Sequence, residues 1–117
     1  LFFLDYYLSD SFEDFVPPAP FNLDELDPAG VLPPRVYTKD EMRAYLRHGR
    51  AKAQAVVEGL TEERAREHRR FSNRDGTLLE LVLVSLRHVQ HHTAQLNLIL
   101  RQTIDDAPRW VGRAKEA

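Results

Sequence analysis

The chain has 117 residues, of which 43% are hydrophobic and 29% are charged, which is ordinary for a single globular domain. The formal net charge is −2, so electrostatics give no case for a nucleic-acid partner or an anionic membrane surface. The absence of cysteine excludes disulfides and any thiol nucleophile supplied by the chain, and it fits a cytoplasmic location. No apolar run approaches the roughly 20 residues that a membrane helix needs. We therefore predict one domain over residues 1–117.

The N-terminal part combines a helix end with a long proline-rich segment. Leu1, Leu4 and Leu8 share one side of a helical pattern that is already under way at the first residue, so we expect that residues before Leu1 are missing from the sequence. Residues 9–37 hold six of the seven prolines, which remove N–H donors and disfavour helix. A segment this long without regular structure predicts a crossover loop. Its expected buried anchors are Phe12, Phe15, Phe21 and Leu23.

Two capping boxes mark the starts of two long helices. Thr38–Glu41 opens the first, which is expected to end near Gly59. Thr77–Glu80 opens the second, which meets no Pro or Gly before residue 108 and is predicted to run to about Thr103. At 1.5 Å per residue this helix is roughly 40 Å long. Because its apolar positions cover most of the circumference, we expect it to be the central helix.

The remaining segments are short. Thr61 caps a charged helix that is expected to run to about His68, and residues 71–76 are predicted as a loop. In the polar C-terminal tail, Trp110 and Val111 are expected to pack against the helices. Since no strand pattern is present, the predicted fold class is all-α, an antiparallel bundle with one long crossover.

Three of the five histidines lie within five residues of the last predicted helix. His88 and His92 are four residues apart, so on a helix they lie one turn apart on the same face, with Cβ atoms about 5–6 Å apart. Two neutral imidazoles placed in this way can share one metal ion. Gln95 falls on the same face one turn further, where it can orient a ligand or a metal-bound water. His91 is expected to face solvent.

The same residues also have a plainer interpretation. Composition alone often produces two histidines at this spacing, and a helix histidine is usually a surface residue or a satisfied core residue. A catalytic zinc also needs a third protein ligand. His48, between arginines, and His68, in a charged run, are poor candidates for it. Val89 follows His88 where a zinc protease of the zincin type has a glutamate general base.

The string LRHVQHHTAQLN, residues 86–97, resembles the last-helix signature of the DinB-like superfamily of damage-inducible and YfiT-type metal-binding four-helix bundles. The opening LFFLDYYLS, the proline-rich segment, the helix around Tyr45 and the closing PRWV fit the same family, so the resemblance covers essentially the whole chain. It implies an up-down-down-up bundle whose first helix, and the start of whose second, would precede Leu1. It also implies a divalent ion held by His88, His92 and a third histidine immediately before Leu1.

The resemblance further implies a metal-dependent enzyme that transfers or isomerises a small-molecule substrate with a low-molecular-weight thiol such as bacillithiol or mycothiol. A metal-activated water would instead give a hydrolase. A chain without cysteine must borrow its thiol, and Zn²⁺ with an open position can bind that thiol and lower its pKa. Ni²⁺ suits imidazole ligands equally well. The expected assembly is a homodimer. The alternative is a non-catalytic helical protein that acts through dimerisation, with a structural or lost metal site.

Two residues are candidates for a catalytic role. Tyr7 would lie two turns from the third histidine, where its hydroxyl would approach a metal-bound water or a substrate; it is otherwise a core aromatic residue with a polar tip. Gln95 is the other.

Overall fold

The computed structural model describes residues 1–30 and 32–113 and is mostly helical. Its elements, in chain order, are α1 (Phe2–Tyr7), the short 3₁₀ helix η1 (Asp24–Leu26), α2 (Lys39–Glu58), α3 (Glu62–Ala65), β1 (His68–Phe71), β2 (Arg74–Thr77) and α4 (Leu78–Ile104). The two strands form a small antiparallel sheet. The all-α prediction is therefore correct for most of the fold and wrong for residues 68–77.

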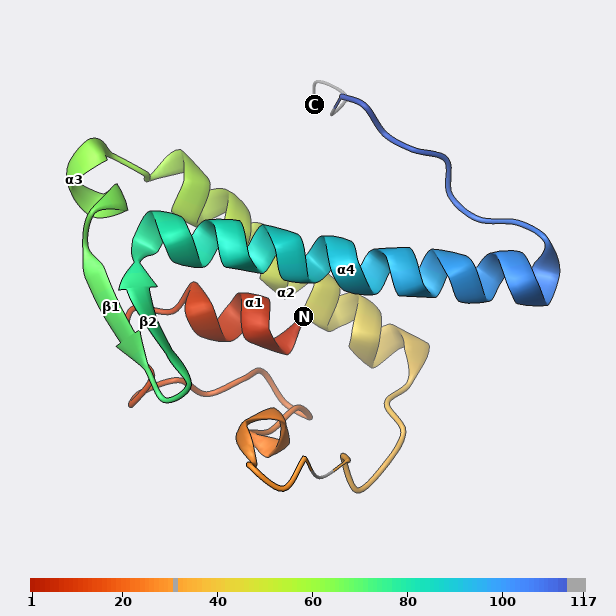
Figure 1. Cartoon of the computed structure of the whole chain (residues 1–117). Coiled ribbons are helices and arrows are strands. Elements are labelled where there is room, and N and C mark those ends of the chain that lie inside the picture. Colours follow the sequence, from red (N-terminus) through yellow and green to blue (C-terminus); the bar gives the residue numbers. More distant parts are fainter. Residues whose placement is uncertain (31, 114–117) are drawn as a thin grey trace.

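Three helices pack side by side, with α1 in contact with both α2 and α4. In Figure 1, α1 and α2 run in the same direction and α4 runs in the opposite one. Because α1 and α2 are parallel, the chain must return to its starting end between them, and the described parts of this connection, residues 8–30 and 32–38, run below the helices. Gly49 permits the close approach of α1 to α2, since a Cβ atom there would lie 3.3 Å from the side chain of Leu4.

The helix ends follow the capping signals in the sequence. The Thr38 hydroxyl accepts from the Glu41 N–H at 3.2 Å, and the Glu41 carboxylate accepts from the Thr38 N–H at 2.8 Å. Thr77 and Glu80 make the same pair of bonds at the start of α4. Gly59 ends α2 as predicted, and α4 ends one residue beyond the predicted Thr103.

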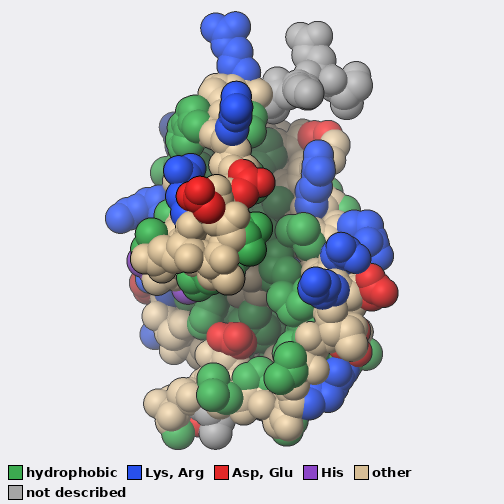
Figure 2. All heavy atoms as spheres, turned by 90° about the vertical axis from the view of Figure 1, so that its right-hand side faces the viewer, with side chains coloured by type: hydrophobic (Ala, Val, Ile, Leu, Met, Phe, Trp, Pro, Cys, Tyr) green, Lys and Arg blue, Asp and Glu red, His purple; other side chains and the backbone are tan. Residues whose placement is uncertain are grey.

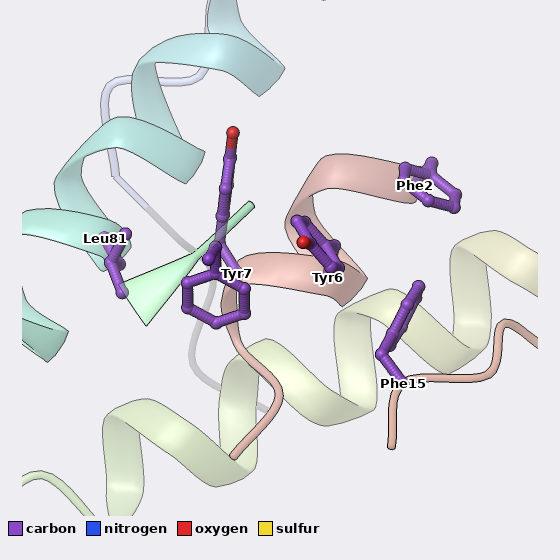
Figure 3. Packing of buried hydrophobic residues seen from close by; sticks show 6 residues of the cluster. Phe2, Tyr6, Tyr7, Phe15 and Leu81 are labelled. Atoms are coloured by element: carbon purple, nitrogen blue, oxygen red, sulfur yellow. The ribbon is translucent and has the colours of Figure 1, made fainter. Parts of the chain in front are cut away.

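The core is a cluster of aromatic side chains around α1. Phe2, Tyr6 and Tyr7 of α1 meet Phe15 of the connection, together with Phe71 of β1 and Leu81 of α4, and Figure 3 shows how most of these side chains converge. Tyr6 is completely buried, with its ring centroid 4.9 Å from that of Phe71 and 5.2 Å from that of Phe15. These inclined pairs stabilise the core beyond simple burial.

The hairpin is the main departure from the predicted elements. The helix expected to reach about His68 ends at Ala65, and His68 pairs with Thr77 across the sheet while Phe71 pairs with Arg74. The turn lies at Ser72 and Asn73, inside the predicted loop. Tertiary contacts explain the difference: Phe71 is buried against α1, while the hydroxyls of Tyr6 and Tyr7 bond to the Ser72 hydroxyl at 2.9 Å and the Asn73 side chain at 3.1 Å.

Several predicted packing residues are exposed instead. Of the expected anchors in the connection, Phe15 is buried and Phe21 partly buried, but Phe12 is 38% and Leu23 49% exposed. Trp110 and Val111 are 89% and 72% exposed, so the prediction that the tail packs against the helices is wrong for them. The chain turns away from the helices at Asp105, whose φ of 53° is left-handed. Residues 114–117 of the tail lie outside the described residues.

The burial of α4 is confined to its first half. Leu78, Leu81 and Ser85 are buried, whereas Leu96 and Ile99 are more than half exposed. In Figure 1 the C-terminal half of α4 extends beyond α1 and α2. The central-helix prediction therefore holds only for the first half. Within the described ranges, no helix combines the length and apolarity needed to cross a bilayer.

Candidate metal centre on α4

The structure brings His88 and His92 together as their spacing predicts. Both lie on α4, and their ring centroids are 4.5 Å apart with the rings inclined by 73°. His91 is exposed, as expected, although its ring centroid is only 5.1 Å from that of His92. The pair therefore presents two imidazoles within one small volume at the middle of the helix.

His88 is the better buried member of the pair. Its ring packs edge-on against Phe3 of α1, with centroids 5.5 Å apart. Burial lowers the pKa of His88, and the neighbouring charge of His92 lowers it further. The imidazole is therefore neutral at pH 7, which is the form that binds a metal ion.

Gln95 orients the ring of His92. The Nδ1 atom of His92 lies 2.8 Å from the Gln95 side-chain oxygen. Because that oxygen only accepts hydrogen bonds, Nδ1 carries the proton in the neutral ring and the lone pair is on Nε2. This is how a second residue fixes the tautomer of a metal-ligating histidine. Both His92 and Gln95 are solvent-exposed, so the donor set fits an ion that is reached from outside the core.

One buried polar atom near the pair has no partner among the described residues. Ser85 is 2% exposed and lies one turn before His88, and its hydroxyl makes no hydrogen bond. Most buried polar side-chain atoms in proteins are hydrogen-bonded. The face of α4 that carries His88 thus retains an unused polar group.

The structure places Tyr7 in the core. Tyr7 is 5% exposed, and its hydroxyl donates to the Asn73 side chain at 3.1 Å rather than to a histidine. Its ring stacks on Phe3, which also contacts His88. Tyr7 therefore supports the packing behind His88.

No third metal ligand joins the pair within residues 1–30 and 32–113. No group of three or more His, Asp or Glu side chains there is arranged to hold an ion. His68 lies at the start of β1, and His48 faces α1 from α2, where its Nε2 atom is 3.0 Å from the carboxylate of Asp5. Neither histidine belongs to the candidate centre, in agreement with the sequence.

A second polar cluster, on the opposite side of α1, was not predicted. Its centre is Asp5, which is 1% exposed and accepts bonds from the Lys52 ammonium, His48 and the Tyr45 hydroxyl. Lys52 also donates to the Ser9 hydroxyl at 2.7 Å. Burial raises the pKa of Tyr45, and the charge of Asp5 raises it further, so the phenol stays protonated. The one signal in the sequence was an aspartate inside an apolar helix, which requires a cation partner.

Comparison with known protein families identifies the chain. A family model described as DinB superfamily matches residues 4–96, which is most of the sequence. The chain belongs to the DinB superfamily. The match takes in most of α1, all of α2 and the hairpin, and the part of α4 that carries His88, His92 and Gln95. Comparisons of this DinB-superfamily chain with curated proteins and with solved structures give no match.

Proposed function

We propose that this DinB-superfamily protein is a divalent-metal-dependent enzyme in which His88 and His92 supply two ligands to Zn²⁺ or Ni²⁺. The observation that carries the proposal is the combination of two imidazole rings whose centroids are 4.5 Å apart with the hydrogen bond that Nδ1 of His92 donates to the Gln95 side-chain oxygen. One ring is kept neutral by burial, and the other has its tautomer fixed by an amide. Borderline metals such as Zn²⁺ and Ni²⁺ favour this ligand type.

The third ligand, in this proposal, is a histidine immediately before Leu1, and the complete domain is a four-helix bundle with residues 8–38 as its crossover. Two features of the structure support this arrangement. Phe3, near the start of α1, packs edge-on against His88 with ring centroids 5.5 Å apart, so this end of α1 lies beside the histidine pair. In addition, α1 and α2 run parallel and α4 antiparallel to them, as an up-down-down-up bundle requires of its last three helices.

The reaction we propose is transfer of a low-molecular-weight thiol to a small-molecule substrate, in which the thiol gives up its proton, its sulfur bonds to the substrate and a leaving group departs, or the corresponding hydrolysis by water. A bound divalent ion with an open position would lower the pKa of a thiol or a water molecule. The chain's own residues have three tasks: His88 remains neutral, Gln95 holds His92 in one tautomer, and Phe3 shields one side of His88. The nucleophile in this proposal is the external thiol or water.

A non-catalytic role is the second candidate, and one observation favours it. The second half of α4 exposes large apolar side chains, which is typical of a surface that another helix covers. In this alternative the metal site is structural or lost, and the protein acts through dimerisation. The two candidates differ in whether the ion keeps a position open to a thiol.

Metal content tests the ligand assignment. Full-length protein is expected to carry about one divalent ion per chain, measured by plasma mass spectrometry after gel filtration. His88→Ala and His92→Ala should remove the ion, and Gln95→Ala should weaken its binding by roughly 10- to 100-fold. His91→Ala is the matched control and should retain it. Full occupancy in the His88 and His92 variants would refute the assignment.

The coordination of the ion separates the two candidates. X-ray absorption at the metal edge is expected to show nitrogen and oxygen neighbours in the resting protein and a new sulfur neighbour after a low-molecular-weight thiol is added. An ion that accepts no sulfur ligand, with coordination already complete, would favour the structural role and contradict the thiol-transfer proposal.

A further inference from the structure

α1 contacts the candidate metal centre and α2 through opposite sides. Phe3 and Asp5 are two positions apart, which corresponds to about 200° around a helix. The Phe3 ring packs against His88 of α4, with centroids 5.5 Å apart, whereas the Asp5 carboxylate faces α2. Because both side chains belong to the same short stretch of helix, whatever fixes the rotation of α1 at Asp5 also fixes the position of Phe3 against His88.

Lys52 fixes α1 from the side of α2. Its ammonium donates to the Asp5 carboxylate, to the Asp5 backbone oxygen at 2.9 Å and to the Ser9 hydroxyl at 2.7 Å, which uses all three of its protons. His48 and Tyr45 add contacts to the Asp5 carboxylate at 3.0 Å and 3.2 Å. Since one ammonium holds both the side chain and the backbone of Asp5, α1 cannot rotate or slide along α2 without breaking hydrogen bonds.

The position of Lys52 is unusual for a lysine. On the face of the molecule shown in Figure 2, Lys and Arg side chains lie at the surface, where such side chains are usually found. The Lys52 side chain is only 26% exposed, and that of Asp5 is 1% exposed. The ammonium also lies over the buried ring of Phe15, 5.5 Å from its centroid. The pair therefore belongs to the interior between α1 and α2 and is not a solvated surface ion pair.

Stability alone does not account for a buried ion pair of this kind. The free energy lost when two charges leave water largely offsets their attraction, so apolar side chains of similar volume often stabilise a fold equally well. Apolar side chains do not, however, specify a direction. Hydrogen bonds between fixed partners select one arrangement of two helices, as a buried polar residue selects the register of a coiled coil. The pair of Asp5 and Lys52 is therefore suited to setting the position of α1.

We propose that Asp5 and Lys52 are positioning residues of the metal centre, which set its affinity for the divalent ion by fixing α1 in the rotation that packs Phe3 on His88. A ring held in one orientation binds an ion more tightly than a free ring, because less conformational freedom is lost on binding. The statement about affinity rests on the proposed metal-dependent function. The statement about position does not, because the contact between Phe3 and His88 involves no metal ion.

Replacement of both charges together separates position from stability. In the double variant Asp5→Leu/Lys52→Met, apolar side chains take the place of the ion pair. Its urea midpoint is expected to change less than that of Asp5→Asn, which leaves the Lys52 ammonium without a counter-charge. The dissociation constant of full-length protein for Zn²⁺, measured by competition with a chromophoric chelator, is nevertheless expected to rise roughly tenfold.

Proton NMR of full-length protein freed of metal with a chelator measures the position of Phe3 directly, because an aromatic ring shifts the resonances of protons beside it. At about pH 8, where histidine is ordinarily neutral, the ring protons of His88 are expected to move toward the positions of free histidine in the double variant. The matched control is Glu62→Leu/Arg66→Met, which replaces an ion pair whose side chains are 79% and 77% exposed. It should change neither the His88 resonances nor the affinity for Zn²⁺.

Unchanged affinity for Zn²⁺ and unchanged His88 resonances in a folded double variant would overturn the proposal. If circular dichroism shows that the double variant is unfolded, Tyr45→Phe replaces it, because this substitution removes one hydrogen bond to Asp5 and leaves the ion pair in place. Tyr45→Phe is expected to move the His88 resonances in the same direction and to raise the dissociation constant for Zn²⁺ about twofold. The absence of both changes would overturn the proposal equally.

The two readouts distinguish failure of this proposal from failure of the proposed function. If the unaltered protein binds no Zn²⁺ while the His88 resonances move in the double variant, the metal-dependent function fails and the positioning of His88 by the ion pair stands. If the unaltered protein and the double variant bind Zn²⁺ equally tightly and their His88 resonances coincide, the positioning proposal fails and the metal centre stands.

Discussion

The carboxylate of Asp5 holds α1 and α2 together. It is almost fully buried, and it accepts hydrogen bonds from Lys52, His48 and Tyr45, all of which lie on α2. A buried charge is costly unless it is paired, and removal of one partner of such a pair is strongly destabilising. The position of α1, and with it the packing of Phe3 against His88, therefore depends on this network.

Replacement of Asp5 by Asn is expected to lower the free energy of unfolding by about 3 kcal/mol, because it leaves the largely buried Lys52 ammonium without its counter-charge. The Lys52 side chain is 26% exposed, so water compensates for only part of the loss. Urea unfolding followed by circular dichroism measures the change. Glu13→Gln, at an exposed position of the connection, is the control and should change stability by less than about 0.5 kcal/mol. Equal effects of the two substitutions would contradict the role of Asp5.

At the residue scale, the sequence predicted contacts within one helix and missed contacts between helices. The proximity of His88 and His92 and the bond to Gln95 follow from spacings of three and four residues. The partners of Asp5 lie 40 to 47 positions further along the chain. No local pattern identifies them, because His48 and Lys52 both lie in a part of α2 that has the composition of an exposed surface.

At the scale of the elements, the N-terminal end of α2 is stabilised by the negative charge of one capping residue, Glu41. Glu41 accepts from the Thr38 backbone and from the guanidinium of Arg35 at 2.7 Å and 3.0 Å. The hydrogen bond from Arg35 and that from Thr38 lower the pKa of Glu41 to about 2. Since this pKa is depressed in the folded state, the contribution of Glu41 to stability is complete above its ordinary value of 4.5 and is lost as the pH falls toward 2.

Glu41→Gln should therefore reduce the dependence of the unfolding free energy on pH between 4.5 and 2. Glutamine retains a side-chain acceptor for the capping box but removes the charge. Urea unfolding of both proteins across this pH range measures the difference. Parallel stability profiles for the two proteins would show that Glu41 is not ionised preferentially in the folded state.

Helices with capping boxes were predicted almost to the residue, whereas the hairpin was not predicted at all. The capping boxes carry their signal locally, in Thr38 and Thr77 and the glutamates three positions later. The strands contain only one large apolar residue, Phe71, among charged neighbours, so they lack the alternation that indicates a strand. Their pairing is stabilised by the contacts of α1 with Phe71, Ser72 and Asn73, which the local sequence does not encode.

On the scale of the whole molecule, the second half of α4 is the largest element without a packing partner among the described residues. Between Arg87 and Arg101 it contains no Lys, Arg, Asp or Glu, while Leu96, Leu98 and Ile99 are more than half exposed. An apolar surface without repelling charges can pack against another apolar surface, including that of a second copy of the chain. We propose that two copies of the chain pack through this part of α4.

Analytical ultracentrifugation of full-length protein should then show a dimer. Ile99→Glu should shift the equilibrium toward monomer, because it places a charged side chain in the apolar surface that the second copy would bury. Gln102→Glu places the same charge on an exposed polar position of the same helix and should leave the dimer intact. Unaltered protein that sediments as a monomer at all concentrations would contradict this surface as an interface between copies.

The central claim is that the imidazoles of His88 and His92 bind one divalent ion together. Nitrogen NMR of full-length protein with labelled histidine, titrated with Zn²⁺, tests it most directly. The account predicts that one equivalent of Zn²⁺ shifts the ring nitrogens of His88 and His92, with Nε2 of His92 as the metal-bound atom, and leaves those of His48 and His68 in place. Unchanged resonances of His88 and His92, or equal shifts of all histidines, would contradict it.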